Sequence, residues 1–395
     1  MVNARPPSEY PSSNGRPGRY VRQLTGYLAF IPAPLPPDPP LEMTGTMQRL
    51  LSEADRALGR LEGSVQTLPN SDLFVYMYVR KEAVLSSQIE GTQSSLQDLL
   101  AAEAHALGEG RPGDVAEVVN YVAAMNYGLA RLADLPISIR LFREIHALLL
   151  RGVRGSRLTP GELRTTQNWI GPGGCTLAEA TFVPPPPTEV LNALGALESF
   201  LHREDELPLL VKIGMAHYQF ETIHPFLDGN GRIGRLLITF LLCERGVLPK
   251  PVLYLSHYFK RHRQDYYDRL QSVRDEGDFE SWMEFFLRGV AEVSVEAADT
   301  ARKILELREE DRRRINDRLG RASGNGHRVL EQLYEQPIIS VGNVQELLGT
   351  TFAGANQIVQ RLVDLGILTE ITGRARNRRF RYDAYVRLFE EGTET

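Results

Sequence analysis

Cysteine is scarce in this sequence. Its 395 residues include two cysteines, Cys175 beside paired glycines and Cys243 inside an apolar run. Two thiols cannot form a disulfide framework, and they cannot supply a cysteine-based zinc cluster. The composition therefore excludes a small disulfide-stabilised secreted domain, and it favours a reducing, cytoplasmic compartment.

Long apolar runs are also missing. The longest, residues 236–243, is bounded by charged residues and is far shorter than the roughly 20 residues that span a bilayer. Residues 1–10 have no apolar core of the kind that a secretory signal needs. The formal net charge of −5 gives no overall field that would gather nucleic acid or an anionic membrane. We therefore expect a cytoplasmic protein without a membrane partner, in which any contact with nucleic acid is local.

The spacing of apolar residues predicts a mainly α protein with more than one domain. Hydrophobic residues make up 42% of the chain, which is enough to fill several cores. Residues 164–187 instead alternate short β-prone pieces with turn formers, which is typical of a β-hairpin or flap. Apolar residues at helical spacing predict helices within residues 72–100, where Gly91 looks like the end of a helix, and over 115–132, 138–151, 190–204 and 209–223.

Composition also divides the chain into successive parts. Residues 1–45 are crowded with proline, glycine and serine, which disfavours helix and sheet and predicts an extended arm. A helical region follows at 46–110, then a helical core at 111–290. Residues 291–322 are rich in charge and predict a solvated linker helix.

The remaining tail, residues 323–395, begins at a Ser-Gly-Asn-Gly boundary. It predicts three short helices followed by a ribbon with strands at 367–371 and 378–382, which is the winged-helix pattern. Arginines on the ribbon and on the expected recognition helix suggest DNA binding. Acidic residues in the tail dilute this charge, so internal packing or a homodimer contact is the alternative. The arginines are Arg361, Arg374, Arg376, Arg378, Arg379 and Arg381.

The segment richest in chemistry is 224–235, which reads His-Pro-Phe-Leu-Asp-Gly-Asn-Gly-Arg-Ile-Gly-Arg. Gly229 and Gly231 let backbone N–H groups turn inward, and an apolar run beginning at residue 236 indicates a helix that opens there. Phosphate would therefore meet both a nest of N–H groups and the positive end of a helix. Arg232 and Arg235, one helical turn apart, can form forked bonds to the same anion.

Two further side chains of this segment complete a phosphate-transfer site. Asp228 can hold Mg²⁺, which takes few protein ligands and shares the rest with water and phosphates. His224 is the group in the segment whose ordinary pKa lets it accept a proton near neutrality, as activation of a hydroxyl requires. Taken singly, each residue has an ordinary explanation, such as a loop histidine, a turn or a solvated arginine pair. Their ordered combination predicts phosphoryl or nucleotidyl transfer, and the Lys-Ser/Thr ending of a P-loop is missing.

The same segment closely resembles the signature of the Fic family, His-x-Phe-x-Asp/Glu-Gly-Asn-Gly-Arg-x-x-Arg, at every specified position. The resemblance implies a Fic-type helical core and a protein adenylyltransferase, which moves AMP from ATP to a Ser, Thr or Tyr hydroxyl of a target protein or of itself. It assigns the base to His224, Mg²⁺ to Asp228 and the γ-phosphate to Arg235. The remaining phosphate contacts fall on Gly229, Asn230, Gly231 and Arg232.

Three other segments resemble parts of that family. Residues 164–187 resemble the flap on which a target segment docks as an added strand, although an ordinary surface hairpin would look the same. Residues 86–91 resemble the inhibitory motif Ser/Thr-x-x-x-Glu-Gly/Asn, with Ser86 and Glu90 at its ends. Glu90 would then pair with Arg235 in place of the γ-phosphate, whereas the alternative is a solvated glutamate at a helix end. Tyr266 and Tyr267 either stack on adenine or fill the core.

Two other functions stay open. The chain can be a Fic-fold transferase of another phosphate-containing group, or a transcription regulator that binds DNA through residues 323–395. Because no motif residue lies after about residue 320, we expect a chain cut there to keep its chemistry.

Overall fold

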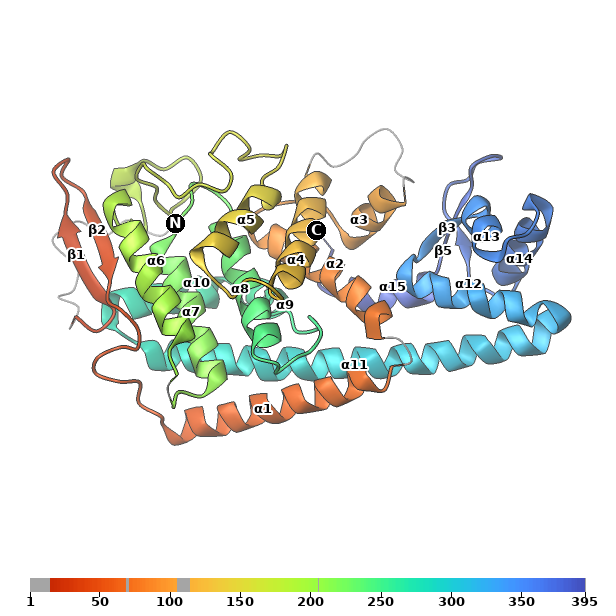
Figure 1. The fold of residues 1–395 in the computed structure, drawn as a ribbon, viewed down its shortest axis with the longest axis horizontal. Helices are drawn as coiled ribbons and strands as arrows, with labels where there is room; N and C mark the ends of the chain where they lie inside the picture. The colour runs from red at the N-terminus through yellow and green to blue at the C-terminus, as the bar shows by residue number, and fades with distance from the viewer. Residues whose placement is uncertain (1–14, 69–70, 105–113, 205, 395) are drawn as a thin grey trace. The chain divides into compact units, whose positions relative to one another are not determined.

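The computed structural model describes residues 15–68, 71–104, 114–204 and 206–394. The chain forms two compact units, one made of Met1–Leu58, Asn120–Leu248 and Tyr258–Val293, the other of Gly59–Val119, Pro249–His257 and Ser294–Thr395. The first residues of the expected arm and the boundary expected near residue 110 between the helical region and the core lie outside the described residues. The mainly α prediction is confirmed (Figure 1).

The first unit contains most of the predicted core. Its elements are β1 (Gly18–Arg22), β2 (Leu28–Pro32), α5 (Ile139–Leu149), the short 3-10 helix η1 (Leu177–Glu179), α6 (Pro187–His202), α7 (Leu209–Ile223), α8 (Asn230–Glu244) and α10 (Arg263–Glu276). Four helices have residues in both units: α1 (Gly45–Gln66), α4 (Val115–Arg131), α9 (Ser256–Arg261) and α11 (Phe279–Leu319).

Helix α7 is the centre of the first unit. Its residues from Leu210 to Ile223 are all buried, because apolar side chains occur on every side of the helix. Helices α6 and α8 pack against it, as Figure 1 shows. Each fully buried side chain such as Met215 or Phe220 contributes roughly 1.5–3 kcal/mol of burial. The site carried by the ends of α7 and α8 is therefore built on rigid elements. Among the described helices, none is long and apolar enough to cross a membrane.

The N-terminal arm contains a β-hairpin, so the expectation that residues 1–45 avoid sheet is wrong for this part. Strands β1 and β2 pair antiparallel, with Tyr20 opposite Phe30. No proline lies between Pro17 and Pro32, and β-prone residues therefore keep their backbone donors there. The turn closes through Gly26, whose φ is +96°.

The predicted flap, residues 164–187, is a hairpin-like loop with little regular strand. Its two limbs meet at one antiparallel bridge between Ile170 and Phe182. Three glycines and Pro172 lie between these residues, and four prolines follow at 184–187, so a longer ladder is disfavoured. The second limb also meets the N-terminal hairpin, because the N–H of Phe30 donates to the carbonyl of Val183 at 2.9 Å.

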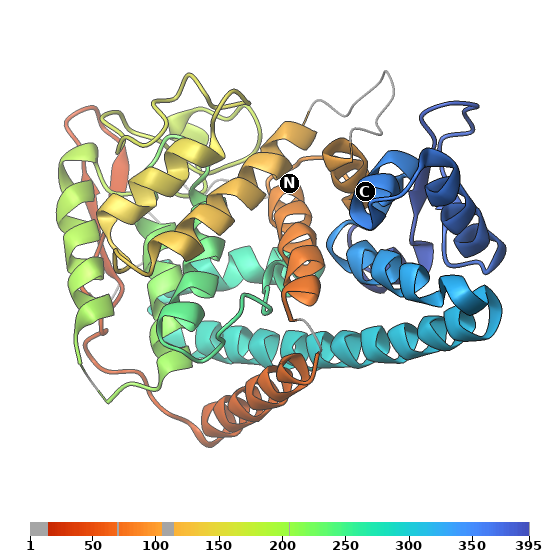
Figure 2. The ribbon, with the colours of Figure 1, turned by 45° about the vertical axis from the view of Figure 1, so that its right-hand side comes forward.

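The second unit holds the remaining elements. They are α2 (Ser71–Ile89), α3 (Leu96–Glu103), the 3-10 helix η2 (Gly320–Ala322), α12 (Ser323–Glu335), β3 (Ile338–Ser340), α13 (Val341–Leu348), α14 (Phe352–Asp364), β4 (Thr369–Glu370), β5 (Arg379–Arg381) and α15 (Asp383–Glu390). The three strands form an antiparallel sheet in the order β3-β5-β4, and Figure 2 shows this C-terminal part of the chain in blue.

Three details of the tail differ from expectation. The strand β3, only three residues long, adds to the expected ribbon. The predicted boundary at residues 323–326 is helical, because it forms the first turn of α12. A last helix, α15, follows the ribbon and was not predicted. The winged-helix assignment itself stays a prediction.

Candidate active site

His224 lies at the turn between α7 and α8. It follows the last residue of α7, and its backbone is left-handed, with φ +48° and ψ +60°. A side chain larger than glycine in this conformation costs about 1–2 kcal/mol. Its Nδ1 lies 3.3 Å from the carbonyl oxygen of Glu221. A proton on Nδ1 that donates to this oxygen places the imidazole lone pair on Nε2, and this is the state that a general base requires.

The base of the flap contacts the backbone of this turn. The buried guanidinium of Arg164 donates to the carbonyl of His224 at 2.9 Å, and Asn168 Nδ2 donates to the carbonyls of His224 at 3.3 Å and Phe226 at 2.8 Å. Burial lowers the pKa of Arg164 to about 10, so the side chain keeps its charge at neutral pH. No local pattern predicts these contacts, because the residues that meet are far apart along the chain.

Asn230 closes the loop before α8. Its Oδ1 accepts from the N–H of Phe226 at 2.8 Å, and its Nδ2 donates to the carbonyl of Phe226, also at 2.8 Å. The side chain is buried, and both ends of its amide have these backbone partners. A phosphate contact by Asn230, predicted from the motif, would therefore come from its backbone N–H.

His146 on α5 is a site residue that sequence reasoning missed. Its Nδ1 accepts from the N–H of Gly161 at 2.8 Å, so Nε2 carries the proton and donates to the carbonyl of Asp228 at 3.0 Å. Burial lowers the pKa of His146 to about 4, which keeps the ring neutral. The one available signal was its position on the apolar face of α5, where a buried histidine must find partners for both nitrogens.

Asp228 faces two glycines and an arginine. Its Oδ1 accepts from the N–H of Gly229 at 2.6 Å and lies 3.6 Å from Nη2 of Arg232. A Cβ added at Gly155, whose φ is +84°, would come within 2.5 Å of Asp228 Oδ2. Among the described residues there is no group of three or more His, Cys, Asp or Glu side chains that could hold a metal. Mg²⁺ needs only one or two carboxylates from a protein, and the partly exposed Asp228 fits that requirement.

The first turn of α8 brings the predicted phosphate contacts together. Gly229 caps the helix with φ +77°, and the N–H groups at this end have no partner within the helix. Arg232 and Arg235 are both buried on this helix, 1% and 3% exposed. A buried guanidinium is stable only beside hydrogen-bond acceptors or negative charge. This end of α8 is therefore suited to an anion.

Gly234 lies between the two arginines in the sequence and has no room for a side chain. An added Cβ would lie 2.2 Å from Oε1 of Glu221. The backbone carbonyl of Gly234 accepts from Nδ1 of His217 at 2.8 Å, so the ring of His217 has its lone pair on Nε2. Burial lowers the pKa of His217 to about 3. Sequence reasoning missed His217 as a site residue, as it missed His146.

The two tyrosines after α8 lie in different surroundings. Tyr266 is 1% exposed, donates its hydroxyl to Nε2 of His217 at 2.8 Å and stacks on Phe259 with 4.4 Å between ring centroids. Tyr267 is 38% exposed, and the guanidinium carbon of Arg263 lies 5.8 Å from the centroid of the Tyr267 ring. For Tyr266 the structure favours the core alternative, whereas adenine stacking by Tyr267 stays a prediction.

The predicted inhibitory segment ends α2. The helix stops at Ile89, and Gly91 has φ +95°, so the expected helix end at the glycine is confirmed. Ser86 is buried and Glu90 is half-buried, and the N–H of Glu90 donates to the carbonyl of Ser87 at 3.0 Å. Glu90 belongs to the second unit and Arg235 to the first, and their pairing stays a prediction.

The tail presents part of its predicted basic face. Arg374 and Arg376 are exposed between β4 and β5, whereas Arg361 on α14 and the remaining three arginines are half-buried. Arg378 Nη2 donates to Asn356 Oδ1 on α14 at 2.9 Å, and Arg381 pairs with Asp383.

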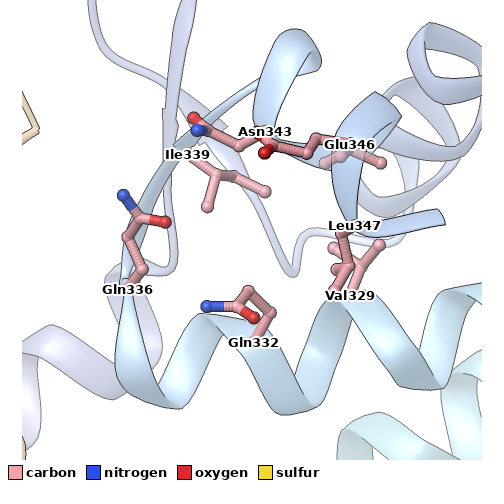
Figure 3. Close-up of a pocket in the computed structure, with 8 residues that line it drawn as sticks. Val329, Gln332, Gln336, Ile339, Asn343, Glu346 and Leu347 are labelled. Carbon is pink, nitrogen blue, oxygen red and sulfur yellow. The ribbon is translucent and has the colours of Figure 1, made fainter. Parts of the chain in front are cut away.

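A cavity of about 200 Å³ lies between α12, β3 and α13, and it contains none of the predicted site residues (Figure 3). It is lined by Val329, Gln332, Gln336, Ile339, Asn343, Val344, Glu346 and Leu347. Asn343 already bonds Ser340, the residue that caps α13, so part of the polar lining is used within the fold.

Comparisons of the sequence with known proteins point to the same family as the motif. Residues 48–130 match the Fic/DOC family N-terminal model, and residues 136–242 match the Fic/DOC family model. The chain is 32% identical over 198 residues to the protein adenylyltransferase Fic of Culex quinquefasciatus, covering 49% of this chain and 35% of that one. It is 29% identical over 219 residues to the same-named protein of Drosophila grimshawi, covering 55% of this chain and 38% of that one. The chain thus spans well under half of the length of these curated relatives.

A solved structure supports the fold. A Fic family protein from Desulfovibrio desulfuricans G20 superposes with a TM-score of 0.58 at 20% identity, covering 87% of this chain and 97% of that one. At this identity the likeness concerns the fold alone.

Proposed function

We propose that the chain, whose residues 48–130 and 136–242 match the Fic/DOC family models, is a protein adenylyltransferase. It transfers AMP from ATP to a Ser, Thr or Tyr hydroxyl of a target protein. One observation carries the proposal. His224 stands with its Nδ1 facing a carbonyl, directly before the turn that opens the N-terminus of the buried, arginine-bearing helix α8.

The proposed reaction is an in-line displacement at the α-phosphorus of ATP. Nε2 of His224 takes the proton of the target hydroxyl, whose oxygen forms the new bond to phosphorus. The bond between that phosphorus and the oxygen bridging to the β-phosphate breaks, and pyrophosphate leaves. Groups aimed at the phosphates before reaction usually supply most of the rate enhancement in such transfers. The N–H groups at the start of α8, Arg232 and Arg235 are suited to this role.

The proposed metal ligand is Asp228. Asp228 would hold Mg²⁺, which supplies neutralising charge on the phosphates when it is bound. The chain's own contribution is to keep that carboxylate in place. His146 holds the backbone of Asp228, and the N–H of Gly229 holds its Oδ1.

The target segment is proposed to dock on the flap, residues 164–187. Phe182 and Val183 on its second limb are already engaged, with Ile170 on one side and with Phe30 of β2 on the other. An added strand would therefore use the first limb beside Trp169, because the N–H and carbonyl of Ile170 already pair with the second limb. The same limb contacts the backbone of His224 through Asn168.

Glu90 is proposed to inhibit the transfer. Its carboxylate would compete with the γ-phosphate for Arg235, so that ATP binds in an unproductive pose. The support is the position of Glu90 directly after the last residue of α2, Ile89, and before the left-handed Gly91. Since about 1.4 kcal/mol of barrier is tenfold in rate, loss of one charge-assisted contact predicts a gain of about tenfold or more in Glu90→Gly.

The decisive experiment follows label from ATP into protein. Full-length parent, Glu90→Gly and Glu90→Gly/His224→Ala proteins are incubated with Mg²⁺ and ATP labelled at the α or the γ position. We expect α label on the chain itself, most in Glu90→Gly and none in the double variant. His202→Ala, which removes a histidine of α6 that bonds the carbonyl of Ile137, controls for stability. Label from γ alone would show phosphorylation, and equal α labelling without His224 would remove it as the base.

A second candidate function is DNA binding by the tail, residues 323–395. It is favoured by the exposed Arg374 and Arg376, which lie in the loop between two strands beside helix α14. A salt-sensitive affinity for duplex DNA that falls in Arg374→Ala/Arg376→Ala would support it. Affinity unchanged by that variant would contradict it.

A further inference from the structure

Resting on the proposed function, we infer that Arg164 is a positioning residue that holds the base His224 in register with the flap. The residue is 2% exposed and comes from the first limb of the flap. It does not touch the reacting atoms. Its effect on transfer acts through the backbone of the catalytic turn.

The guanidinium joins three pieces of chain. Its Nε donates to the carbonyl of His224 at 2.9 Å, and its Nη2 donates to the carbonyls of Pro185 at 2.5 Å and Ile223 at 3.3 Å. The backbone N–H of Arg164 donates to the carbonyl of Pro225 at 3.0 Å. The side chain therefore connects both limbs of the flap to Ile223 and to the base, and the backbone N–H of the same residue adds the contact to Pro225.

Two of these contacts stabilise the backbone at the end of α7, at Ile223 and His224. Ile223 is the last residue of α7, and carbonyls at the end of a helix lack partners within the helix and favour a nearby cation. His224 follows in a left-handed conformation that its side chain disfavours. Among the described residues, all hydrogen-bond partners of the Arg164 side chain are backbone carbonyls and none is a carboxylate. The guanidinium charge therefore stabilises the backbone of the flap and of the catalytic turn.

The phosphate side of the site has separate supports. His146 holds the carbonyl of Asp228, and Asn230 holds the backbone of Phe226. Loss of Arg164 is therefore expected to displace the base from the target hydroxyl while leaving the nucleotide cradle in place. A displacement of about 1 Å at a reacting group can lower a rate by about a hundredfold.

The experiment uses Arg164→Ala and Arg164→Lys in full-length Glu90→Gly protein. Lysine keeps the charge but has no planar fork, so it cannot bond the carbonyls of His224 and Pro185 in the same way. Arg245→Ala is the matched control, because Arg245 Nη2 donates to the carbonyl of Leu201 near the end of α6. Three quantities are measured for each protein: the rate of self-labelling by α-labelled ATP, the Kd for ATP, and the NMR titration of the His224 imidazole, assigned with His224→Ala.

We expect labelling to fall by about tenfold to a hundredfold in both Arg164 variants, with the Kd for ATP within about twofold of the parent. The His224 titration should shift in these variants and stay unchanged in Arg245→Ala. Folded Arg164 variants that label at the parent rate, or whose Kd weakens as much as their rate, overturn the inference. If Arg164→Ala does not fold, Arg164→Lys decides. If Glu90→Gly itself takes no α label, the proposed function fails, and an unaltered His224 titration would separately overturn this inference.

Discussion

The ring of His146 lies flat against the ring of Phe226, with 3.9 Å between centroids and 10° between planes. This stacking joins α5 to the loop that precedes α8. The same histidine accepts from Gly161 and donates to the carbonyl of Asp228, so both of its nitrogens are engaged. A protonated His146 would lose the bond from Gly161, because Nδ1 could no longer accept. The turn before α8 is therefore sensitive to the protonation of one buried ring.

The first prediction concerns stability at acidic pH. Burial lowers the pKa of His146 to about 4, whereas an unfolded histidine has its ordinary value near 6.5. Between these values the unfolded chain binds more protons, so the free energy of unfolding should fall as pH drops from about 6.5 towards 4. A difference of one pKa unit corresponds to about 1.4 kcal/mol, so His146 should lower the free energy of unfolding by on the order of 3 kcal/mol over this range. Urea unfolding at several pH values measures it.

A comparison with His146→Gln isolates this effect. Glutamine can still accept from Gly161 and donate to Asp228, but it does not titrate. We expect this variant to have a flatter dependence on pH, with a residual slope from His217, whose pKa burial lowers to about 3. Parallel curves for parent and variant would show that His146 does not contribute to the acid sensitivity.

The second prediction concerns Asn230. Asn230→Ala leaves the buried N–H of Phe226 without its acceptor, which costs roughly 1–3 kcal/mol, whereas the carbonyl of Phe226 keeps its bond from Asn168. Asn230→Asp keeps the acceptor for the Phe226 N–H but sets a carboxylate oxygen against its carbonyl, so it should also destabilise. Asn120→Ala, which loses donor contacts to the carbonyls of Leu149 and Arg151, is the control. Unfolding free energies within about 0.5 kcal/mol of the parent for both Asn230 variants would contradict the assignment.

The helices of the core could be predicted because their signals are local. The predicted helix 209–223 matches α7, since apolar residues run along it and Pro208 precedes it. The hairpin of β1 and β2 was missed because the prolines around it dominate the composition of the whole arm. The pairing of its short strands depends on contacts with the flap, and these are not visible in the local sequence.

The site shows the same division. Residues 224–235 are contiguous, so they could be identified as one candidate site from the sequence, and their chemistry stays a proposal. Arg164, His146 and His217 act on that segment from other elements, and each bonds to a backbone carbonyl. A backbone acceptor leaves no mark in the sequence, because every residue type supplies one. The supports of the site therefore become visible only in the fold.

The third prediction tests the space around Asp228. Gly155→Ala places a Cβ within 2.5 Å of Asp228 Oδ2 at a left-handed position, so the carboxylate must move. Gly152→Ala has the same backbone strain, with φ +68°, but nothing lies within 4 Å of its Cβ. Both variants should lose about 1 kcal/mol of stability from strain, whereas Gly155→Ala alone should need more Mg²⁺ for half-maximal self-labelling. Equal Mg²⁺ dependence in the two variants would contradict a metal role for Asp228.

The last prediction concerns the C-terminal helix α15, which packs against α2. The ring of Phe389 lies 5.4 Å from that of Tyr78 and 6.3 Å from that of Phe74, and Gln88 Nε2 donates to the carbonyl of Thr393 at 3.0 Å. Gln88 lies inside the proposed inhibitory segment. The sequence alone predicts that a chain cut near residue 320 keeps its chemistry. These contacts predict in addition that loss of the tail loosens α2, the helix that directly precedes Glu90.

Phe389→Ala tests this with one side chain. Removing a buried phenylalanine costs about 3–5 kcal/mol and leaves α2 without part of its cover. We expect faster hydrogen exchange over residues 71–91 and, if Glu90 inhibits, self-labelling that rises towards the level of Glu90→Gly. In the Glu90→Gly background the same change should add nothing, because the inhibitor is already gone. Arg387→Ala, on the exposed side of α15, is the control and should alter neither quantity. Faster exchange with unchanged labelling would show that the packing of α15 stabilises α2 without governing the activity.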